Sequence, residues 1–401
     1  MIQFDSRKVK KGDVFVAIKG LTVDGHDYID KAIKNGVKTV YGESDVKNKK
    51  YIRVSNSRNK LGELCSEFYD NPSSKLKVVG VTGTKGKTTT CHLIHHILTE
   101  NGKKTGLIST ISVEGFHTTA PDIITLNKYL FDMVKNGFEY VVLEVSSHGI
   151  DQGRIAGIKF DISVLTNIHP EHLDYHKTFK EYKRIKMMFV NSAQFRVFSP
   201  KETKLKILEG DFNNLNAETA IEVTKELGIS KHDAINALKI FKLPEGRLED
   251  IKNTKGIRIL VDFAHTPDSL KAVLSHLKKS AKGKLVTIFG CAGERDFLKR
   301  PKMGKIASKF SDMVILTAED PRSENVIDII NQIKIGVPKK FKKLYEIIDR
   351  KEAIRFAIRN AKIGDIVAVL GKGHEKTMNL DGINEIPWSD QSVIKEVLRN
   401  K

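Results

Sequence analysis

The chain has few cysteines, few aromatic residues and no long hydrophobic run. Its 401 residues include three cysteines, none in CxxC spacing, which argues against a disulfide framework or a zinc site and suits a reducing cytoplasm. The longest apolar runs, such as 366–370, have strand length, and no N-terminal stretch resembles a signal peptide, whereas a membrane-spanning helix needs about 20 apolar residues. We expect a cytoplasmic protein without membrane insertion.

Acidic residues are also in deficit. The chain has 68 Lys and Arg against 49 Asp and Glu, a formal net charge of +19, and only 7% aromatic residues. The lysines are spread along the chain with acids among them, and few aromatic rings could stack on bases. We interpret the excess as a solvated surface that attracts anionic small molecules, and we expect no nucleic-acid partner. A nucleic-acid-binding protein is the alternative reading of the charge.

The order of short apolar runs and turn signals predicts three domains. Strand-like runs at 14–17, 39–41 and 51–54 precede a turn at 70–74. From residue 77, strands (77–82, 105–109, 139–144, 161–166) alternate with helices (88–101, 122–136, 178–190), and helices follow at 215–226 and 230–241. After a break at 243–246, strands are expected at 257–262, 285–289, 313–317 and 366–370. Such alternation predicts mostly parallel α/β sheets in domains 1–76, 77–243 and 244–401.

A glycine-rich turn follows the first strand of the second domain. Residues 83–90 read Gly-Thr-Lys-Gly-Lys-Thr-Thr-Thr, directly after the apolar run 78–81 and before a helical pattern. Glycines let backbone N–H groups approach phosphates, and the helix N-terminus adds partial positive charge. Lys87 would reach the terminal phosphates and Thr88 would hold Mg²⁺. Five residues, not the usual four, separate Gly80 from Gly86, and the alternative is a structural turn.

Three further features of the second domain could serve the same chemistry. Glu144 ends an apolar strand, where a carboxylate beside a phosphate loop can bind Mg²⁺, although it could also face solvent. Residues 169–176 contain three histidines and two acids, which suits a metal or phosphate neighbourhood or merely a polar loop. Lys186, judged by its sequence context alone, is one lysine among many on a solvated helix face.

Polar loops follow four strands of the third domain, at 262–268, 290–296, 317–322 and 371–375. Parallel strands end at one edge of a sheet, and doubly wound domains bind their ligands at that edge. We therefore expect a binding site formed by these loops.

Taken together, the motifs resemble the Mur ligase family, and within it the members that add the third residue of the peptidoglycan stem peptide. The matching segments occur in order along nearly the whole chain: 5–9, 12–17, 24–27, 83–89, 118–119, 144–148, 151–154, 172–176, 246–249, 262–268, 290–296 and 371–375. The chain departs from the family pattern in being shorter before 5 and between 186 and 213, and in having Phe263 where Tyr is typical. The resemblance implies an α/β, three-domain Mur ligase architecture with an N-terminal UDP-substrate-binding domain, a central P-loop-like ATPase domain and a C-terminal Rossmann-like domain.

The resemblance also implies a role for each motif. Its ATP-binding set is Gly83, Thr84, Gly86, Lys87, Thr88, Thr89, Asn213, Asn216, Arg247 and Asp262. The Mg²⁺ set is Thr88, Glu144, His172 and Lys186, the last as a carbamylated lysine, and the catalytic set is Lys87, Lys186 and His172. The UDP-substrate set is Ser6, Thr118, Thr119, Ser146, Gln152 and Arg154, and the amino-acid set is Arg295, Asp320, Arg322, Gly371 and Glu375.

The implied activity is ATP-dependent amide formation in cell-wall synthesis, by a monomer that joins a UDP-linked muramyl dipeptide to a free amino acid through an acyl phosphate. Arg322 favours meso-diaminopimelate, because its planar fork can pair with a distal carboxylate. The alternatives are the same reaction with L-lysine, or a sibling ligase such as a pseudomurein-type ligase or a folylpolyglutamate synthase. The pattern at 5–25 argues against the folate enzyme, and intact Lys87 and Glu144 argue against a non-catalytic nucleotide-binding regulator.

Overall fold

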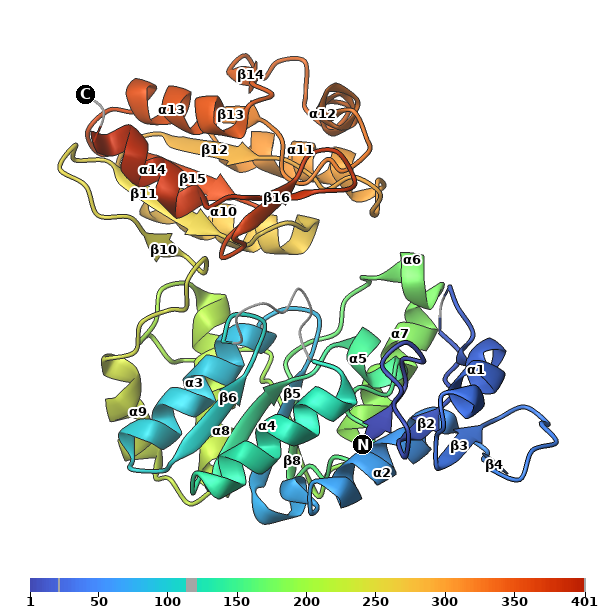
Figure 1. Ribbon diagram of the computed structural model, residues 1–401. Helices are drawn as coiled ribbons and strands as arrows, with labels where there is room; N and C mark the ends of the chain where they lie inside the picture. Colours follow the sequence, from blue (N-terminus) through green and yellow to red (C-terminus); the bar gives the residue numbers. More distant parts are fainter. Residues whose placement is uncertain (21, 113–120, 400–401) are drawn as a thin grey trace. The chain divides into compact units, whose positions relative to one another are not determined.

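A computed structural model describes residues 1–20, 22–112 and 121–399 of the chain (Figure 1). The chain forms two compact units, each considered by itself. The first comprises Met1–Pro170, Phe179–Pro200 and Asn216–Lys239, and the second comprises Glu171–Thr178, Lys201–Leu215 and Ile240–Lys401. Within the described residues, no helix has the length and apolar character that crossing a bilayer requires.

The first unit begins with a small parallel sheet of order β1-β2-β3-β4. Its strands and helices are β1 (Ile2–Gln3), β2 (Val14–Val16), α1 (Ile29–Lys34), β3 (Thr39–Gly42), β4 (Tyr51–Arg53) and α2 (Ser57–Phe68). Phe15, Ile29 and Val40 pack in a core of its own. Helix α2 begins where the Asn56 side chain accepts a hydrogen bond from the Asn59 N–H, a standard N-cap.

The larger sheet of the first unit is parallel, in the order β6-β7-β5-β8-β9. Its strands are β5 (Lys77–Thr82), β6 (Thr105–Ile108), β7 (Tyr140–Glu144), β8 (Ile162–Leu165) and β9 (Phe195–Phe198). The helices along this stretch of chain are α3 (Lys87–Glu100), α4 (Ile123–Lys135), α5 (Ser147–Asp151), α6 (Leu173–His176), α7 (Phe179–Val190), α8 (Asp211–Glu226) and α9 (Lys231–Lys239). Because β5 lies in the middle, the loop after it opens at the centre of the sheet edge, where open α/β sheets bind ligands.

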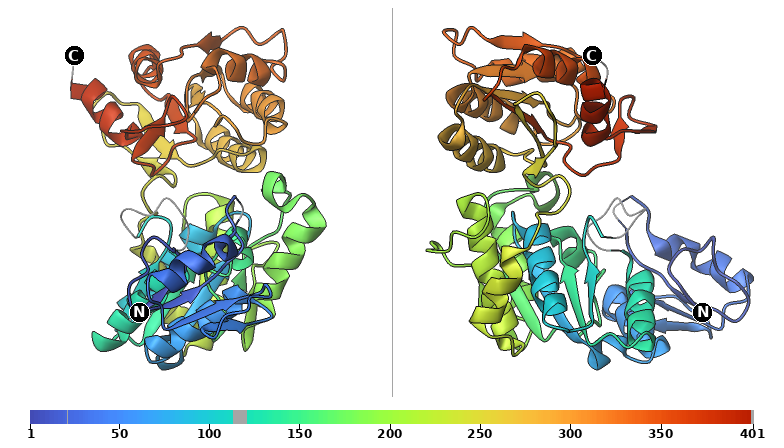
Figure 2. Two further views of the ribbon diagram at one scale, coloured as in Figure 1. Left: turned by 45° about the vertical axis from the view of Figure 1, so that its right-hand side comes forward. Right: turned by 90° about the vertical axis from the view of Figure 1, so that its left-hand side faces the viewer.

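Helices cover both faces of this sheet (Figures 1 and 2). Leu126 of α4 and Phe189 of α7 share one core with Val141 and Leu143 of β7. Helix α3 packs against β6 and β7, and α9 packs against α3. The right-handed crossover rule places α3 on the face of the sheet opposite to α4 and α7. The side chains that form this core fix the direction in which the β5–α3 loop projects.

The second unit is built on a six-stranded sheet of order β10-β11-β15-β12-β13-β14. Its strands are β10 (Glu249–Asp250), β11 (Arg258–Asp262), β12 (Leu285–Phe289), β13 (Met313–Leu316), β14 (Leu344–Glu346) and β15 (Ile366–Leu370), with a separate hairpin of β16 (Thr377–Asn379) and β17 (Glu385–Pro387). The helices are α10 (Pro267–Ser280), α11 (Lys299–Phe310), α12 (Val326–Lys334), α13 (Arg350–Asn360) and α14 (Asp390–Arg399). Within the six-stranded sheet, all pairs except β10–β11 are parallel.

Two cores sandwich this sheet. Leu274 of α10, Met303 of α11 and Ile330 of α12 pack on one face, and α13 and α14 pack on the other through residues such as Ile354 and Ile394. The predicted strands and α/β class are confirmed. The prediction for α8 was wrong by four residues, because the helix begins at Asp211 and not at 215.

Candidate active site

The β5–α3 loop has the form of a phosphate cradle. Gly83 has φ +150° and Gly86 has φ +81°, and a Cβ atom on them would lie 1.8 Å from Thr166 Oγ1 and 2.4 Å from Asn216 Oδ1, respectively. Asn167 holds the loop by accepting from the Lys85 N–H at 2.9 Å. Thr88 and Thr89 lie buried in the first turn of α3, and Lys87 Nζ donates to the Thr84 carbonyl at 3.1 Å. Phosphate oxygens are the usual partners of such an arrangement.

Glu144 lies where the sequence predicts a metal ligand. Its side chain is 2% exposed, and Oε2 accepts from Thr88 Oγ1 at 3.0 Å, from Thr110 N–H at 3.1 Å and from Thr110 Oγ1 at 3.0 Å. A buried carboxylate and a hydroxyl that touch at the mouth of a phosphate loop are oxygen ligands of the kind that Mg²⁺ prefers. The residues present therefore fit the ion.

Lys186 is not on a solvated helix face. It is 1% exposed, and Nζ donates to the Gly83 carbonyl at 2.8 Å and to Thr82 Oγ1 at 3.3 Å. The ammonium also lies 4.9 Å from the centre of the Tyr182 ring, and Tyr182 Oη lies 2.9 Å from Thr84 Oγ1. Tertiary packing thus brings Lys186 to the phosphate loop, as the family resemblance implies and the local sequence does not.

The residues expected to bind the UDP substrate are partly gathered in the first unit. Ser146 caps α5 by accepting from the Gly149 N–H at 3.0 Å, and Arg154 Nη2 donates to Gln152 Oε1 at 2.7 Å. Ser6 lies buried in the N-terminal part of the same unit. Thr118 and Thr119 lie outside the described residues.

Arg58 connects the N-terminal part of the first unit with the segment that contains Gln152, and sequence reasoning missed it. Its guanidinium donates to the Gln152 carbonyl at 2.6 Å and to the Lys19 carbonyl at 2.8 Å. Gly153, with φ +68°, lies against the Arg58 stem, which a Cβ atom would approach to 2.8 Å. An arginine in an N-terminal helix gives no local signal that its partner lies about a hundred residues away.

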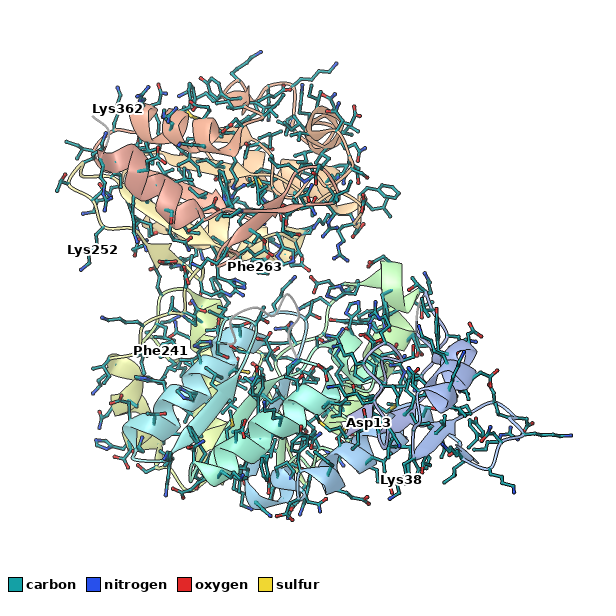
Figure 3. The ribbon with its side chains drawn as sticks, in the orientation of Figure 1. Asp13, Lys38, Phe241, Lys252, Phe263 and Lys362 are labelled. Atoms are coloured by element: carbon teal, nitrogen blue, oxygen red, sulfur yellow. The ribbon has the colours of Figure 1, made fainter. Side chains whose placement is uncertain are left out.

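In the second unit, the end of β11 carries an aromatic and acidic group. Asp262 is buried and accepts from the Leu248 N–H at 2.8 Å; burial raises its pKa, although nearby Arg247 opposes the shift. The Arg247 guanidinium lies 4.7 Å from the centre of the Phe263 ring; Phe263 is labelled in Figure 3. Phe263 also packs against the His374 ring at 5.0 Å. His172, with φ +56°, is the N-cap residue directly before the short helix α6.

The two asparagines expected at the nucleotide are on α8. Asn213 is 3% exposed and belongs to the second unit, and Asn216 is 7% exposed and belongs to the first. Asn216 lies against Gly86 of the phosphate loop. The structure thus places one predicted partner of ATP beside the loop and the other in the first turn of α8.

The loops after β13 and β15 are joined by a buried lysine. Lys372 is 1% exposed, and Nζ donates to Asp320 Oδ1 and Oδ2 at 2.8 and 2.9 Å and pairs with Glu375 Oε2 at 2.7 Å. Burial works against its charged form, but Glu375 and Asp320 outweigh that effect and raise the Lys372 pKa. Asp320 and Glu375 are therefore brought together as predicted, through a lysine that sequence reasoning did not single out.

Arg322 and Glu319 flank this pair. Arg322 has φ +53° and donates from Nη1 to the Gly293 carbonyl at 2.8 Å. Glu319 is 6% exposed and lies 3.3 Å from a Cβ placed on Gly371, and its buried Oε2 has no hydrogen-bond partner among the described residues. Burial raises the pKa of Glu319 to about 7. Arg295, in contrast, lies exposed in the loop after β12.

A buried arginine fixes the starts of both loops. Arg350 forms a bidentate pair with Asp390 at 2.7 and 2.8 Å and donates to the Ala318 and Leu370 carbonyls. Both side chains are at most 1% exposed, so removing either one would leave a buried charge without its counterion. No group of three His, Cys, Asp or Glu side chains placed to hold a metal occurs in the described part of the chain.

Comparisons with known proteins agree with this geometry. Three family descriptions match: "Mur ligase family, catalytic domain" over 1–69, "Mur ligase middle domain" over 81–260 and "Mur ligase, glutamate ligase domain" over 246–373. The chain is 38% identical to proteins named UDP-N-acetylmuramoyl-L-alanyl-D-glutamate–2,6-diaminopimelate ligase from Cytophaga hutchinsonii and Aquifex aeolicus, over 99% of this chain and 94% and 93% of theirs. A solved structure of a ligase with the same name is 26% identical, with a TM-score of 0.67 over 99% of this chain and 94% of that one.

Proposed function

This chain belongs to the Mur ligase family, and from that premise we propose that it is the ATP-dependent ligase that adds meso-diaminopimelate to UDP-N-acetylmuramoyl-L-alanyl-D-glutamate. Relatives at 38% identity over nearly the full length bear the name of that ligase. The observation that carries the proposal is the β5–α3 loop, where Gly83 and Gly86 leave no room for a Cβ and Thr88 touches Glu144. That arrangement is suited to a nucleoside triphosphate with Mg²⁺.

The proposed reaction has two steps. A carboxylate oxygen of the dipeptide attacks the γ-phosphorus of ATP, and ADP leaves. The α-amine of the incoming amino acid then attacks the acyl carbon, loses a proton, and inorganic phosphate leaves. Lys87 and the N–H groups of the loop would position and neutralise the phosphoryl group. Bound Mg²⁺ would add charge neutralisation, and Thr88, Glu144 and His172 are the residues proposed to hold it.

We further propose that Lys186 is carbamylated in the active protein. Its neutral amine would attack CO₂, forming an N–C bond and releasing a proton, so that a cation becomes an anion able to orient a second Mg²⁺. Support comes from its burial and from its distance of 2.8 Å to the Gly83 carbonyl.

For the amino acid, we propose a site made by Arg295, Asp320, Arg322, Gly371 and Glu375, and for the UDP substrate a site made by Ser6, Thr118, Thr119, Ser146, Gln152 and Arg154. We propose ATP contacts from Asn213, Asn216, Arg247 and Asp262. The domain boundaries 1–76, 77–243 and 244–401, a monomeric state and a cytoplasmic location complete the proposal.

The deciding experiment is a ligation assay with purified UDP-muramyl dipeptide, ATP, Mg²⁺ and a panel of free amino acids. We expect ADP and UDP-muramyl tripeptide in equal amounts, with meso-diaminopimelate the best acceptor. Lys87→Ala should abolish both products, whereas Lys128→Ala, an exposed lysine on α4, should leave them unchanged. ADP formation that is independent of the muramyl dipeptide, or an active Lys87→Ala variant, would overturn the assignment.

A further inference from the structure

An ion-pair network fixes the segment that leads into α8. Glu209 precedes the helix and is held in a fork by Arg258 of β11, with Nη1–Oε1 2.8 Å and Nη2–Oε2 2.7 Å. His276 Nε2 of α10 lies 3.0 Å from Oε1. Burial would raise the Glu209 pKa, but Arg258 and His276 outweigh it and hold that pKa below its ordinary value. Two elements of the C-terminal sheet domain thus anchor one carboxylate.

The backbone between Glu209 and α8 is itself fixed. Asn214 Oδ1 accepts from the Ile207 and Leu208 N–H groups at 2.9 and 3.0 Å, and Nδ2 donates to the Leu208 carbonyl at 2.7 Å. Gly210 takes φ +84° at the turn into the helix. Movement of Glu209 would therefore carry the first turn of α8 with it.

Asn213 depends directly on Glu209. Its Nδ2 donates to the Glu209 backbone carbonyl at 2.7 Å, so the amide has a defined orientation, with nitrogen toward Glu209 and the Oδ1 acceptor turned from it. We propose that Glu209, anchored by Arg258 and His276, is a positioning residue that orients the Asn213 amide and so makes the nucleotide site selective for adenine over guanine. This inference rests on the ATP contact assigned to Asn213 in the proposed function.

The hydrogen-bonding groups of the two bases explain why a fixed amide favours adenine over guanine. Adenine offers an exocyclic amine donor beside the N7 acceptor, and a carboxamide matches both with one acceptor and one donor. Guanine offers acceptors at both O6 and N7, so an Asn213 amide that cannot rotate would set Oδ1 against O6. Guanine meets one favourable and one repulsive contact in either orientation of the amide, whereas adenine is matched in only one orientation. An amide that is free to flip would therefore bind adenine more weakly and guanine almost unchanged, and selectivity would fall.

The test measures the binding of ADP and GDP by calorimetry in Glu209→Gln, Asn213→Ala and the double variant. We expect Glu209→Gln to weaken ADP roughly fivefold while GDP changes little, and to add nothing in the Asn213→Ala background, because the two residues act as one unit. Arg258→Lys keeps the charge but loses the fork, and it should shift the ADP/GDP ratio in the same direction.

Asp250→Asn is the matched control. Asp250 Oδ1 accepts a hydrogen bond from Arg258 Nε at 2.7 Å, and the substitution removes the same charge as Glu209→Gln. It should leave the ADP/GDP ratio at its wild-type value. Equal weakening of ADP and GDP in Glu209→Gln, an unchanged ratio, or additive effects in the double variant would overturn the inference. Because binding needs no turnover, a failed ligation assay with an intact Glu209 effect would overturn only the proposed ligase activity.

Discussion

At the scale of single residues, Lys186 carries the sharpest chemical prediction. Its ammonium is buried against the phosphate loop, so an alanine there should remove nearly all ligation, and short carboxylic acids should restore part of it by supplying the missing anion. Lys183→Ala, an exposed lysine on the same helix, is the control and should retain full activity. The carbamate itself should appear as a labelled carbonyl after exposure to ¹³C-bicarbonate. A fully active Lys186→Ala variant would exclude the role.

Arg322 should decide between acceptor amino acids. A guanidinium at the incoming side chain pairs with the distal carboxylate of diaminopimelate, whereas lysine brings a second cation. Loss of such a pair costs about 2–4 kcal/mol, or on the order of a hundredfold in kcat/KM. We expect Arg322→Ala to lower kcat/KM for diaminopimelate while that for lysine changes little, with exposed Lys302→Ala as the control. A wild-type preference for lysine would contradict the selector argument.

Glu319 should make the stability of the C-terminal domain depend on pH. Its folded-state pKa of about 7 lies above the ordinary value of 4.5, so the folded state binds the proton more tightly and stability falls as pH rises from 4.5 through 7. The ionised form costs about 3 kcal/mol above pH 7. Glu319→Gln should therefore raise the thermal midpoint at pH 8 and leave it nearly unchanged at pH 4.5.

The pKa of Asp312 is shifted in the opposite direction to that of Glu319. Lys278 and the Leu285 N–H outweigh burial and lower its pKa, so its contribution is present at neutral pH and fades in acid. Asp312→Asn should lower the thermal midpoint at pH 8. Equal shifts in the two variants would show that the titration of Glu319 has been misassigned.

At the scale of elements, the β5–α3 loop should tolerate no side chain at Gly83. A Cβ there would meet Thr166 Oγ1 at 1.8 Å, whereas Gly102, with φ +73° at the end of α3, has nothing within 4 Å. We expect Gly83→Ala to destabilise the protein by about 2–4 kcal/mol and to abolish ATP binding, and Gly102→Ala to cost about 1 kcal/mol without affecting ATP. Thermal melts with and without ATP would measure both effects.

Strands with an apolar run were predictable from sequence, including the edge strands β4 and β6, whereas the exposed edge strand β9 was not. Strands β5, β11, β12 and β15 were placed to within a residue because apolar runs end at glycine or polar loops. Strand β9 escaped prediction because, as an edge strand, it leaves Phe195 and Phe198 exposed and has no alternating pattern.

The same distinction holds for the candidate site. The phosphate loop and Glu144 follow from local pattern, because strand, turn and helix are contiguous in sequence. Arg58, Arg350 and Lys372 do not, because distant segments supply the carbonyls of Gln152 and Lys19 that Arg58 contacts and the carboxylates of Asp390 and Asp320 that neutralise Arg350 and Lys372. Only the folded chain shows which of 68 basic residues are buried and which are solvated.

At the scale of the whole molecule, the two sequence boundaries should behave differently when the chain is cut. The sheet β10–β15 and both of its cores are built almost wholly from residues after 243, which predicts that a fragment 244–401 folds alone. The N-terminal residues Ile2, Val16 and Leu61, in contrast, share one core with Val78 and Leu143 of the larger sheet.

A fragment 77–243 should therefore lose part of its core and melt well below a fragment 1–243. Each buried apolar side chain contributes about 1.5–3 kcal/mol, so the loss of a few of them removes a large share of the stability of a domain. Circular dichroism melts of the three fragments decide the matter. Cooperative unfolding of the fragment 244–401, together with a lower melting temperature of 77–243 than of 1–243, would show that the chain can be separated at 243 and not at 76. If instead 77–243 melted as 1–243 does, the shared core would contribute no stability, and the N-terminal domain would have to be regarded as independent of the ATPase domain.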